Sequence, residues 1–195
     1  MMKTGKNKRL LASILAASML LAMSPFALAE GTEGQEQPVE GGGTEQTCAA
    51  KIGENKYPTL AGALAAANIY DANSDVTIVM LHDVTENIEI NRSLTLDLGG
   101  HTLSGDGDAE AAVVTISGDK PQVTVKNGTV TGGKKSGIRI TDADVTLTKL
   151  TVTKNASTGN GGGIDAVKGK ELVVEQCAIN ENTAKNSGGG IRVED

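Results

Sequence analysis

Aromatic side chains are scarce in this chain of 195 residues, which has no Trp, one Phe and two Tyr. Immunoglobulin-type sandwiches usually centre on a buried aromatic residue, so the composition disfavours that fold. Proteins that bind single-stranded nucleic acid combine a basic groove with stacking aromatics. The chain lacks such a composition and carries a formal charge of −6. We therefore expect no nucleic-acid partner.

Histidine and cysteine are also rare, with two residues of each. Catalytic triads and zinc sites usually place a His beside Cys, Ser or carboxylates. We find no such spacing around His82 or His101. With no catalytic constellation in view, the sequence favours a protein without enzyme activity. Cys48 precedes the repeats described below, and Cys177 lies in the last of them. Several coils therefore separate the two cysteines, which is farther than a disulfide can reach.

Residues 1–29 have the pattern of a secretory signal peptide. A basic start is followed by an apolar run from Leu10 to Met23, and Ala27-Leu28-Ala29 supplies a small-x-small cleavage pattern. The apolar run is short for a membrane span. We expect cleavage after Ala29, a mature chain without a membrane span, and a secreted or cell-surface location. Loss of this segment removes Lys3, Lys6, Lys8 and Arg9 and no acidic residue, which leaves a formal charge of −10.

Three further regions follow the leader. Residues 30–46 are rich in Gly and Glu and have almost nothing apolar, so they predict a disordered linker. Residues 47–75 predict an N-terminal cap, with a strand near Ala50–Ile52 and a short helix over Leu60–Asn68 whose N-cap is Thr59. Residues 76–195 predict the coils of a solenoid, which needs such a cap at its end.

A pattern of three short strand-like segments is repeated between Leu94 and Val193. The first segment occurs at 94–96, 123–125, 145–147 and 172–174, the second carries Leu103, Val130, Val152 and Ile179, and the third occurs at 114–116, 138–140, 164–166 and 191–193. Matching positions recur every 22 to 29 residues, a period typical of solenoids. The sequence predicts an all-β fold, a parallel β-helix of three-stranded coils with about four to five coils and a short capping helix.

The alignment of the repeats predicts which side chains stack inside the coils. The expected inward columns are Leu94/Val123/Val145/Leu172, Leu96/Val125/Leu147/Val174 and Val114/Ile138/Ile164/Ile191. Successive members should lie about 4.8 Å apart, the spacing of neighbouring strands. An antiparallel sandwich is the alternative, because regular short strands fit it too. A sandwich does not require the repeats to align in register, so the β-helix is favoured.

Two parts of the chain resemble known β-helix families. Asn55–Leu64 followed by Ile88–Gly105 resembles the N-terminal part of pectate-lyase-like right-handed β-helix proteins. Asn160–Ile164 and Ile179–Ile191 resemble the repeats of polymorphic outer-membrane proteins and related bacterial surface β-helices. The resemblance covers roughly residues 50–195 and implies a right-handed coil. It leaves function open, because one fold hosts lyases, hydrolases and adhesins.

One charged residue of each later coil should point outward from the third segment. Strand alternation places Thr115, Arg139, Asp165 and Arg192 on the outer face, with Asp165 between the two arginines. Arginine forks suit carboxylates, so Arg139, Asp165 and Arg192 are the candidate ligand-binding residues. The alternative is a surface charge ladder worth at most ~1 kcal/mol per pair.

Asp106, Asp108 and Glu110 place three carboxylates at alternate positions, a spacing that suits oxygen ligands for calcium. The remainder of an EF-hand loop is missing, and a solvated acidic turn is the alternative. These residues are the candidate metal ligands, and the sequence indicates no other cofactor.

The function hypotheses follow from these features. The first is a secreted or cell-surface protein that binds a polysaccharide or a host or cell-surface component without catalysis. The alternatives are a polysaccharide lyase or glycoside hydrolase, and a structural stalk of a larger surface protein. The apolar layers after Ile191 have no polar capping element behind them. We therefore expect further coils of a longer polypeptide, or a partner that covers this end.

Overall fold

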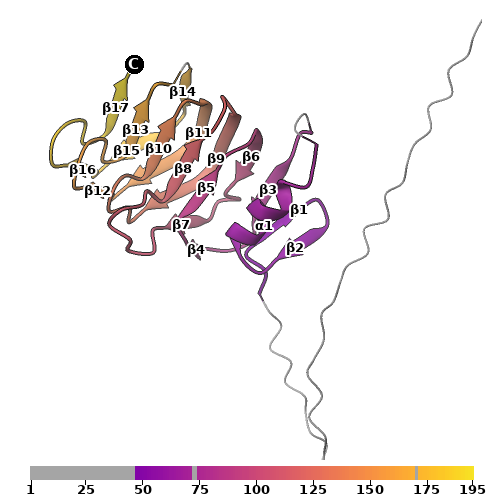
Figure 1. Cartoon of the computed structure of the whole chain (residues 1–195). Coiled ribbons are helices and arrows are strands. Elements are labelled where there is room, and N and C mark those ends of the chain that lie inside the picture. Colours follow the sequence, from indigo (N-terminus) through magenta and orange to yellow (C-terminus); the bar gives the residue numbers. More distant parts are fainter. Residues whose placement is uncertain (1–46, 72–73, 170) are drawn as a thin grey trace, which may run out of the picture. The chain divides into compact units, whose positions relative to one another are not determined.

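The computed structural model describes residues 47–71, 74–169 and 171–195. The predicted leader (1–29) and linker (30–46) lie outside the described residues. The described chain forms a β-solenoid of about four turns, in which short parallel strands stack coil upon coil (Figure 1). The all-β class and the parallel β-helix architecture predicted from the repeats are therefore confirmed.

The coils follow one another along the sequence. The first contains β3 (Thr77–Met80), β4 (Val84–Thr85) and β5 (Ile88–Ile90). The second contains β6 (Leu94–Asp97), β7 (Thr102–Ser104) and β8 (Val114–Ser117). The next contains β9 (Gln122–Thr131) and β10 (Ile138–Thr141), and it is followed by β11 (Asp144–Thr153), β12 (Ala156–Ser157) and β13 (Ile164–Val167). The final coil contains β14 (Leu172–Glu175), β15 (Ala178–Asn180), β16 (Thr183–Ala184) and β17 (Ile191–Glu194).

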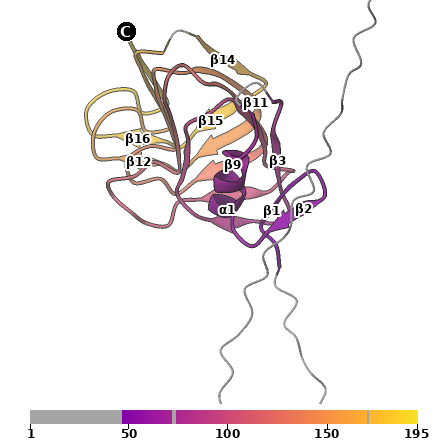
Figure 2. The ribbon, with the colours of Figure 1, turned by 45° about the vertical axis from the view of Figure 1, so that its right-hand side comes forward.

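The register of the parallel strands confirms the predicted columns. Val145 lies between Val123 and Leu172, and Leu147 lies between Val125 and Val174. In the five-stranded sheet, ordered β5-β8-β10-β13-β17, the stacked residues are Ile88, Val114, Ile138, Ile164 and Ile191. These branched side chains fill the inside of the solenoid because alternate residues of a strand face opposite sides. Figure 2 shows the coils from another direction, with the loops at β12 and β16 on one side.

Left-handed backbone recurs at matching corners of the coils, inside β9 and β11 and between β14 and β15. Asn127, Lys149 and Gln176 occupy the same corner in successive coils, with φ of 58°, 54° and 54°. A residue with a Cβ pays for this conformation, whereas Gly does not. The corner geometry is therefore imposed by coil stacking against the preference of the residue.

Lys149→Gly is expected to stabilise the protein by about 1 kcal/mol, because Gly removes the left-handed penalty. Lys149 is exposed, so little packing is lost. Urea unfolding of the two proteins measures the difference. Lys134→Gly is the control, since Lys134 is exposed and has no positive φ. A loss of stability in Lys149→Gly equal to that of the control would contradict this account of the corners.

The N-terminal cap joins the first coil by antiparallel pairing. β1 (Ala50–Ile52) lies between β2 (Asn55–Tyr57) and β3, antiparallel to both. α1 spans Leu60–Ala67, and its N-cap Thr59 accepts a hydrogen bond from the Gly62 N–H at 3.0 Å. The predicted strand, helix and N-cap are confirmed. β2 was not predicted, because its residues have no alternating apolar pattern.

Two charged side chains hold the ends of α1. The Glu86 carboxylate accepts hydrogen bonds from the N–H groups of Leu60 and Ala61, at 3.1 and 2.9 Å. At the other end the Arg92 guanidinium donates to the carbonyls of Ala67, Tyr70 and Asp71. Both charges complement the helix dipole and satisfy backbone groups that a helix end leaves open. The helix is thereby fixed on either side of β5.

Within the described residues, no helix is long and apolar enough to cross a membrane. In the same part of the chain, no disulfide joins Cys48 and Cys177.

Candidate functional site

The outward column of the five-stranded sheet brings the predicted binding residues together. The strand register aligns Thr115 with Arg139, Arg139 with Asp165, and Asp165 with Arg192. Glu89 of β5 begins the same column, beside Thr115. The predicted register of this face is therefore confirmed, and one acidic side chain lies between two basic ones.

Asp165 is bound by both arginines. Its Oδ2 lies 2.8 Å from Nη1 of Arg139, and its Oδ1 lies 2.8 Å from Nη1 of Arg192. The Asp165 side chain is only 3% exposed, while those of Arg139 and Arg192 are 36% and 20% exposed. The arrangement therefore differs from an exposed charge ladder, because its central carboxylate is withdrawn from water and each oxygen holds one guanidinium.

A glycine-rich loop covers Asp165. Gly161 has φ of 57°, and a Cβ added there would collide with Asp165. The loop is stacked on the matching loop of the final coil, since the N–H of Gly161 donates to Ser187 at 2.9 Å and that of Gly162 donates to Gly188 at 2.9 Å. The sequence marks these glycines as tight corners but does not show that they close over an outward carboxylate.

A groove of about 360 Å³ runs between this loop and the outer face of β10, β13 and β17. Its lining residues are Lys135, Arg139, Ser157, Thr158, Gly159, Asn160, Asp165, Val167, Arg192 and Glu194. Three of them are basic and two are acidic, in a chain whose formal charge is −6. Among the described residues, Arg192 contacts the Glu194 carboxylate as well as Asp165, whereas Arg139 contacts Asp165 alone and Lys135 has one exposed partner, Glu110, at 3.9 Å. Arg139 and Lys135 are therefore the cations with fewest competing partners.

Residues 157–160, Lys135 and Glu194 were not predicted as part of the site. They come from loops or strand ends that reach the groove only after the coils are stacked. One sequence signal could have identified the loop, because 155–164 and 182–191 both begin with Asn and end with three glycines and Ile.

A buried asparagine supports the base of the loop. Asn155 is 1% exposed, and its Oδ1 accepts a hydrogen bond from the Gly133 N–H at 2.8 Å. Its Nδ2 donates to the Val130 carbonyl at 3.3 Å and to Oδ1 of Asn182 at 3.0 Å. Asn182, one coil later, donates to the Val152 carbonyl at 2.8 Å. Side-chain amides thus replace backbone pairing where the strands leave the sheet.

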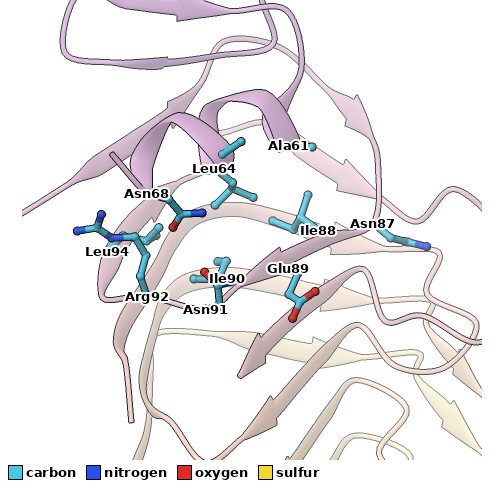
Figure 3. Close-up of a pocket in the computed structure, with 11 residues that line it drawn as sticks. Ala61, Leu64, Asn68, Asn87, Ile88, Glu89, Ile90, Asn91, Arg92 and Leu94 are labelled. Atoms are coloured by element: carbon cyan, nitrogen blue, oxygen red, sulfur yellow. The ribbon is translucent and has the colours of Figure 1, made fainter. Parts of the chain in front are cut away.

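A second, smaller groove lies between α1 and β5 (Figure 3). Its volume is about 210 Å³, and Leu64, Ile88 and Ile90 give it an apolar floor. Asn68 and Glu89 line its rim. Arg92 lines it too, but its guanidinium is committed to the C-terminus of α1. This groove has no cation left to hold an anionic ligand.

The candidate calcium ligands do not converge on one point. Oδ1 of Asp106 accepts from the Asp108 N–H at 2.9 Å and from the Asn87 amide, and Oδ1 of Asp108 accepts from the Glu110 N–H at 2.8 Å. Within the described residues, no group of three or more His, Cys, Asp or Glu side chains is placed to hold a metal ion. The segment is a chain of turns built on carboxylate acceptors, and calcium binding stays a prediction.

Comparison with protein-family models, with curated proteins and with solved structures gives no match to this chain. The assignment to the β-solenoid fold therefore rests on its strand pairing, its register and its buried columns.

Proposed function

We propose that this chain is a secreted or cell-surface β-helix protein that binds carboxylate-bearing glycans of a host or cell surface, without catalysis. The observation that carries the proposal is the placement of Arg139 and Arg192 in one groove by the buried Asp165. A guanidinium whose rotamer is already fixed loses less entropy when it binds a carboxylate. The free donors of Arg139 and the ammonium group of Lys135 are the groups offered to the ligand.

Several other features support this function. The signal-peptide pattern of residues 1–29 points to export. The resemblance to pectate-lyase-like proteins and to bacterial surface β-helices points to a right-handed coil and an extracellular role. Thr158 and Asn160 line the groove and can exchange hydrogen bonds with sugar hydroxyls. Catalysis is not part of the proposal, because the described residues that line the groove include no nucleophile hydrogen-bonded to a base. A lyase needs only a base, and the test below distinguishes it.

Arg139→Lys is expected to weaken glycan binding at least tenfold, because Lys keeps the charge beside Asp165 but loses the planar fork. The measurement is calorimetric titration of the mature protein with polygalacturonate, hyaluronan and a neutral glucan. The Arg139→Gln/Arg192→Gln variant should abolish binding. Its control is Lys51→Gln/Lys56→Gln, which removes the same charge from the cap.

Two results would overturn the proposal. One is unchanged binding of every acidic glycan by Arg139→Lys and by the double Gln variant. The other is the appearance of unsaturated or reducing ends when the protein is incubated with these glycans, with and without Ca²⁺. That result would replace the binding protein by a lyase or a hydrolase.

A further inference from the structure

The two histidines of the chain occupy matching positions in neighbouring coils. β4 and β7 run side by side in parallel, with Val84 paired with Leu103 (Figure 1). His82 precedes Val84 by two residues, and His101 precedes Leu103 by two. The register therefore places both histidines at the same corner of the first two coils. Their spacing in the sequence does not reveal this pair, because each residue belongs to a different coil.

Asp83 contacts Nδ1 of both imidazole rings. Its main-chain carbonyl lies 2.7 Å from Nδ1 of His82, and since a carbonyl oxygen only accepts, that nitrogen carries the proton. The Asp83 carboxylate accepts a hydrogen bond from the Thr102 N–H at 2.9 Å and lies 3.6 Å from Nδ1 of His101. A carboxylate on this side favours the proton on Nδ1 of the neutral ring. Both neutral rings therefore keep the lone pair on Nε2, which is the atom left to bind a metal ion.

Nε2 of His82 is buried and has no hydrogen-bond partner among the described residues. A buried polar atom in this state is unusual, and a bound ion or water is a common explanation. This nitrogen has no hydrogen bond to give up, so it gains an interaction without losing one when a metal ion binds. The corner is open to ions from solvent, because the side chains of His101 and Asp83 are 35% and 74% exposed.

The separation of the two rings suits a single ion. Neighbouring strands are about 4.8 Å apart, and two imidazole nitrogens on one zinc ion are about 3 Å apart, given Zn–N bonds of about 2.0–2.1 Å. Rotation of the side chains can bring the two nitrogens this much closer. In the described part of the chain, no group of three or more His, Cys, Asp or Glu is placed to hold a metal ion. The two histidines are therefore the protein ligands, and water completes the coordination.

From these observations we propose that His82 and His101 bind one divalent transition-metal ion, Cu²⁺, Ni²⁺ or Zn²⁺, through their Nε2 atoms. Neutral imidazole suits these ions, whereas Ca²⁺ and Mg²⁺ prefer oxygen ligands. Asp83 is a positioning residue, because it holds the opposite nitrogen of each ring. The ion ties the first coil to the second at this corner. The site is distinct from the acidic turn that begins at Asp106 and from the groove along β10, β13 and β17.

The test titrates the untagged mature protein with Cu²⁺, Ni²⁺ and Zn²⁺ in a calorimeter. The Cys48→Ser/Cys177→Ser background removes thiols as ligands. One site is expected for each ion, with Cu²⁺ the tightest, and an excess of Ca²⁺ or Mg²⁺ should not compete. Electron paramagnetic resonance of the Cu²⁺ complex should show two imidazole nitrogens. Because the ion binds only the folded corner, the metal should also raise Tm by a few degrees.

His82→Gln and His101→Gln are each expected to weaken Cu²⁺ binding about 100-fold or more, since loss of an outer partner alone costs about 10–100-fold. Asp83→Asn should weaken binding by that smaller factor and keep the two-nitrogen spectrum. Asp106→Asn/Asp108→Asn is the matched control and should bind like the wild type. Circular dichroism without metal checks that each variant is folded.

Four results would overturn the proposal. The first is the absence of binding of all three transition metals by the wild type. The second is unchanged affinity in either histidine variant, which would place the ion elsewhere, for example at the chain terminus. The third is an equal loss of affinity in Asp106→Asn/Asp108→Asn, which would move the site to the acidic turn. The fourth is a Cu²⁺ spectrum with a single nitrogen ligand.

Discussion

Asn155→Ala is expected to lower the free energy of unfolding by about 4 kcal/mol. The side chain is 1% exposed and joins two coils through hydrogen bonds to Gly133, Val130 and Asn182. Its removal leaves the Gly133 N–H buried without a partner, which costs about 1–3 kcal/mol, and it removes the hydrogen bonds to Val130 and Asn182, which contribute about 1 kcal/mol each. Urea unfolding followed by circular dichroism measures the loss.

Asn180→Ala provides the control for this experiment. Asn180 is exposed, and its side chain accepts one hydrogen bond, from the Thr153 hydroxyl. Its replacement is expected to change stability by about 0.5 kcal/mol or less. Equal losses in Asn155→Ala and Asn180→Ala would show that the buried amide does not hold the coils together.

Asp165→Ala is expected to cost about 3 kcal/mol. Removal of one partner from a buried ion pair costs about 3–5 kcal/mol, because it leaves a charge without compensation. The lower end of that range applies here, since Arg139 and Arg192 are partly exposed and can turn toward water. Chemical denaturation in low salt is the measurement. A loss below about 1 kcal/mol would mean that these ion pairs contribute no more than exposed surface pairs do.

The matched control is Asp119→Ala, which removes an exposed carboxylate from the same solenoid. A change within about 0.5 kcal/mol is expected there. A double-mutant cycle of Asp165→Ala with Arg139→Gln then isolates the coupling between these two residues. Additive effects in that cycle would mean that the Arg139–Asp165 pair does not explain the loss.

The repeats carry most of the information about the fold. Columns such as Val123/Val145/Leu172 could be assigned because one spacing is repeated at each strand and a shift by one residue would reverse the faces. The same alternation placed Arg139, Asp165 and Arg192 side by side. These inferences need only the period of a strand and the distance between strands.

The rest of the site depends on contacts between loops, which have no period. The burial of Asp165 requires that Gly161 fold over it, and a glycine at a corner is compatible with many loop paths. Lys135 lines the same groove but belongs to the coil of β10, one coil before that of Asp165. The hydrogen bonds of Glu86 and Arg92 to the ends of α1 join residues 21 to 26 positions apart. No local sequence pattern indicates them. Such tertiary contacts could not be predicted from one sequence.

The attachment of α1 has a consequence for the order of folding. The helix is too short to be stable alone, and the two side chains that hold its ends flank β5. The cap therefore closes only when the first coil has formed, so the earliest cooperative unit extends at least from β1 to Arg92. Each later coil pairs with the coil that precedes it in the sequence. An example is the hydrogen bond from the Asn155 N–H to the Asn182 side chain, 27 residues later. We therefore expect the coils to form in order from the N-terminal side of the solenoid.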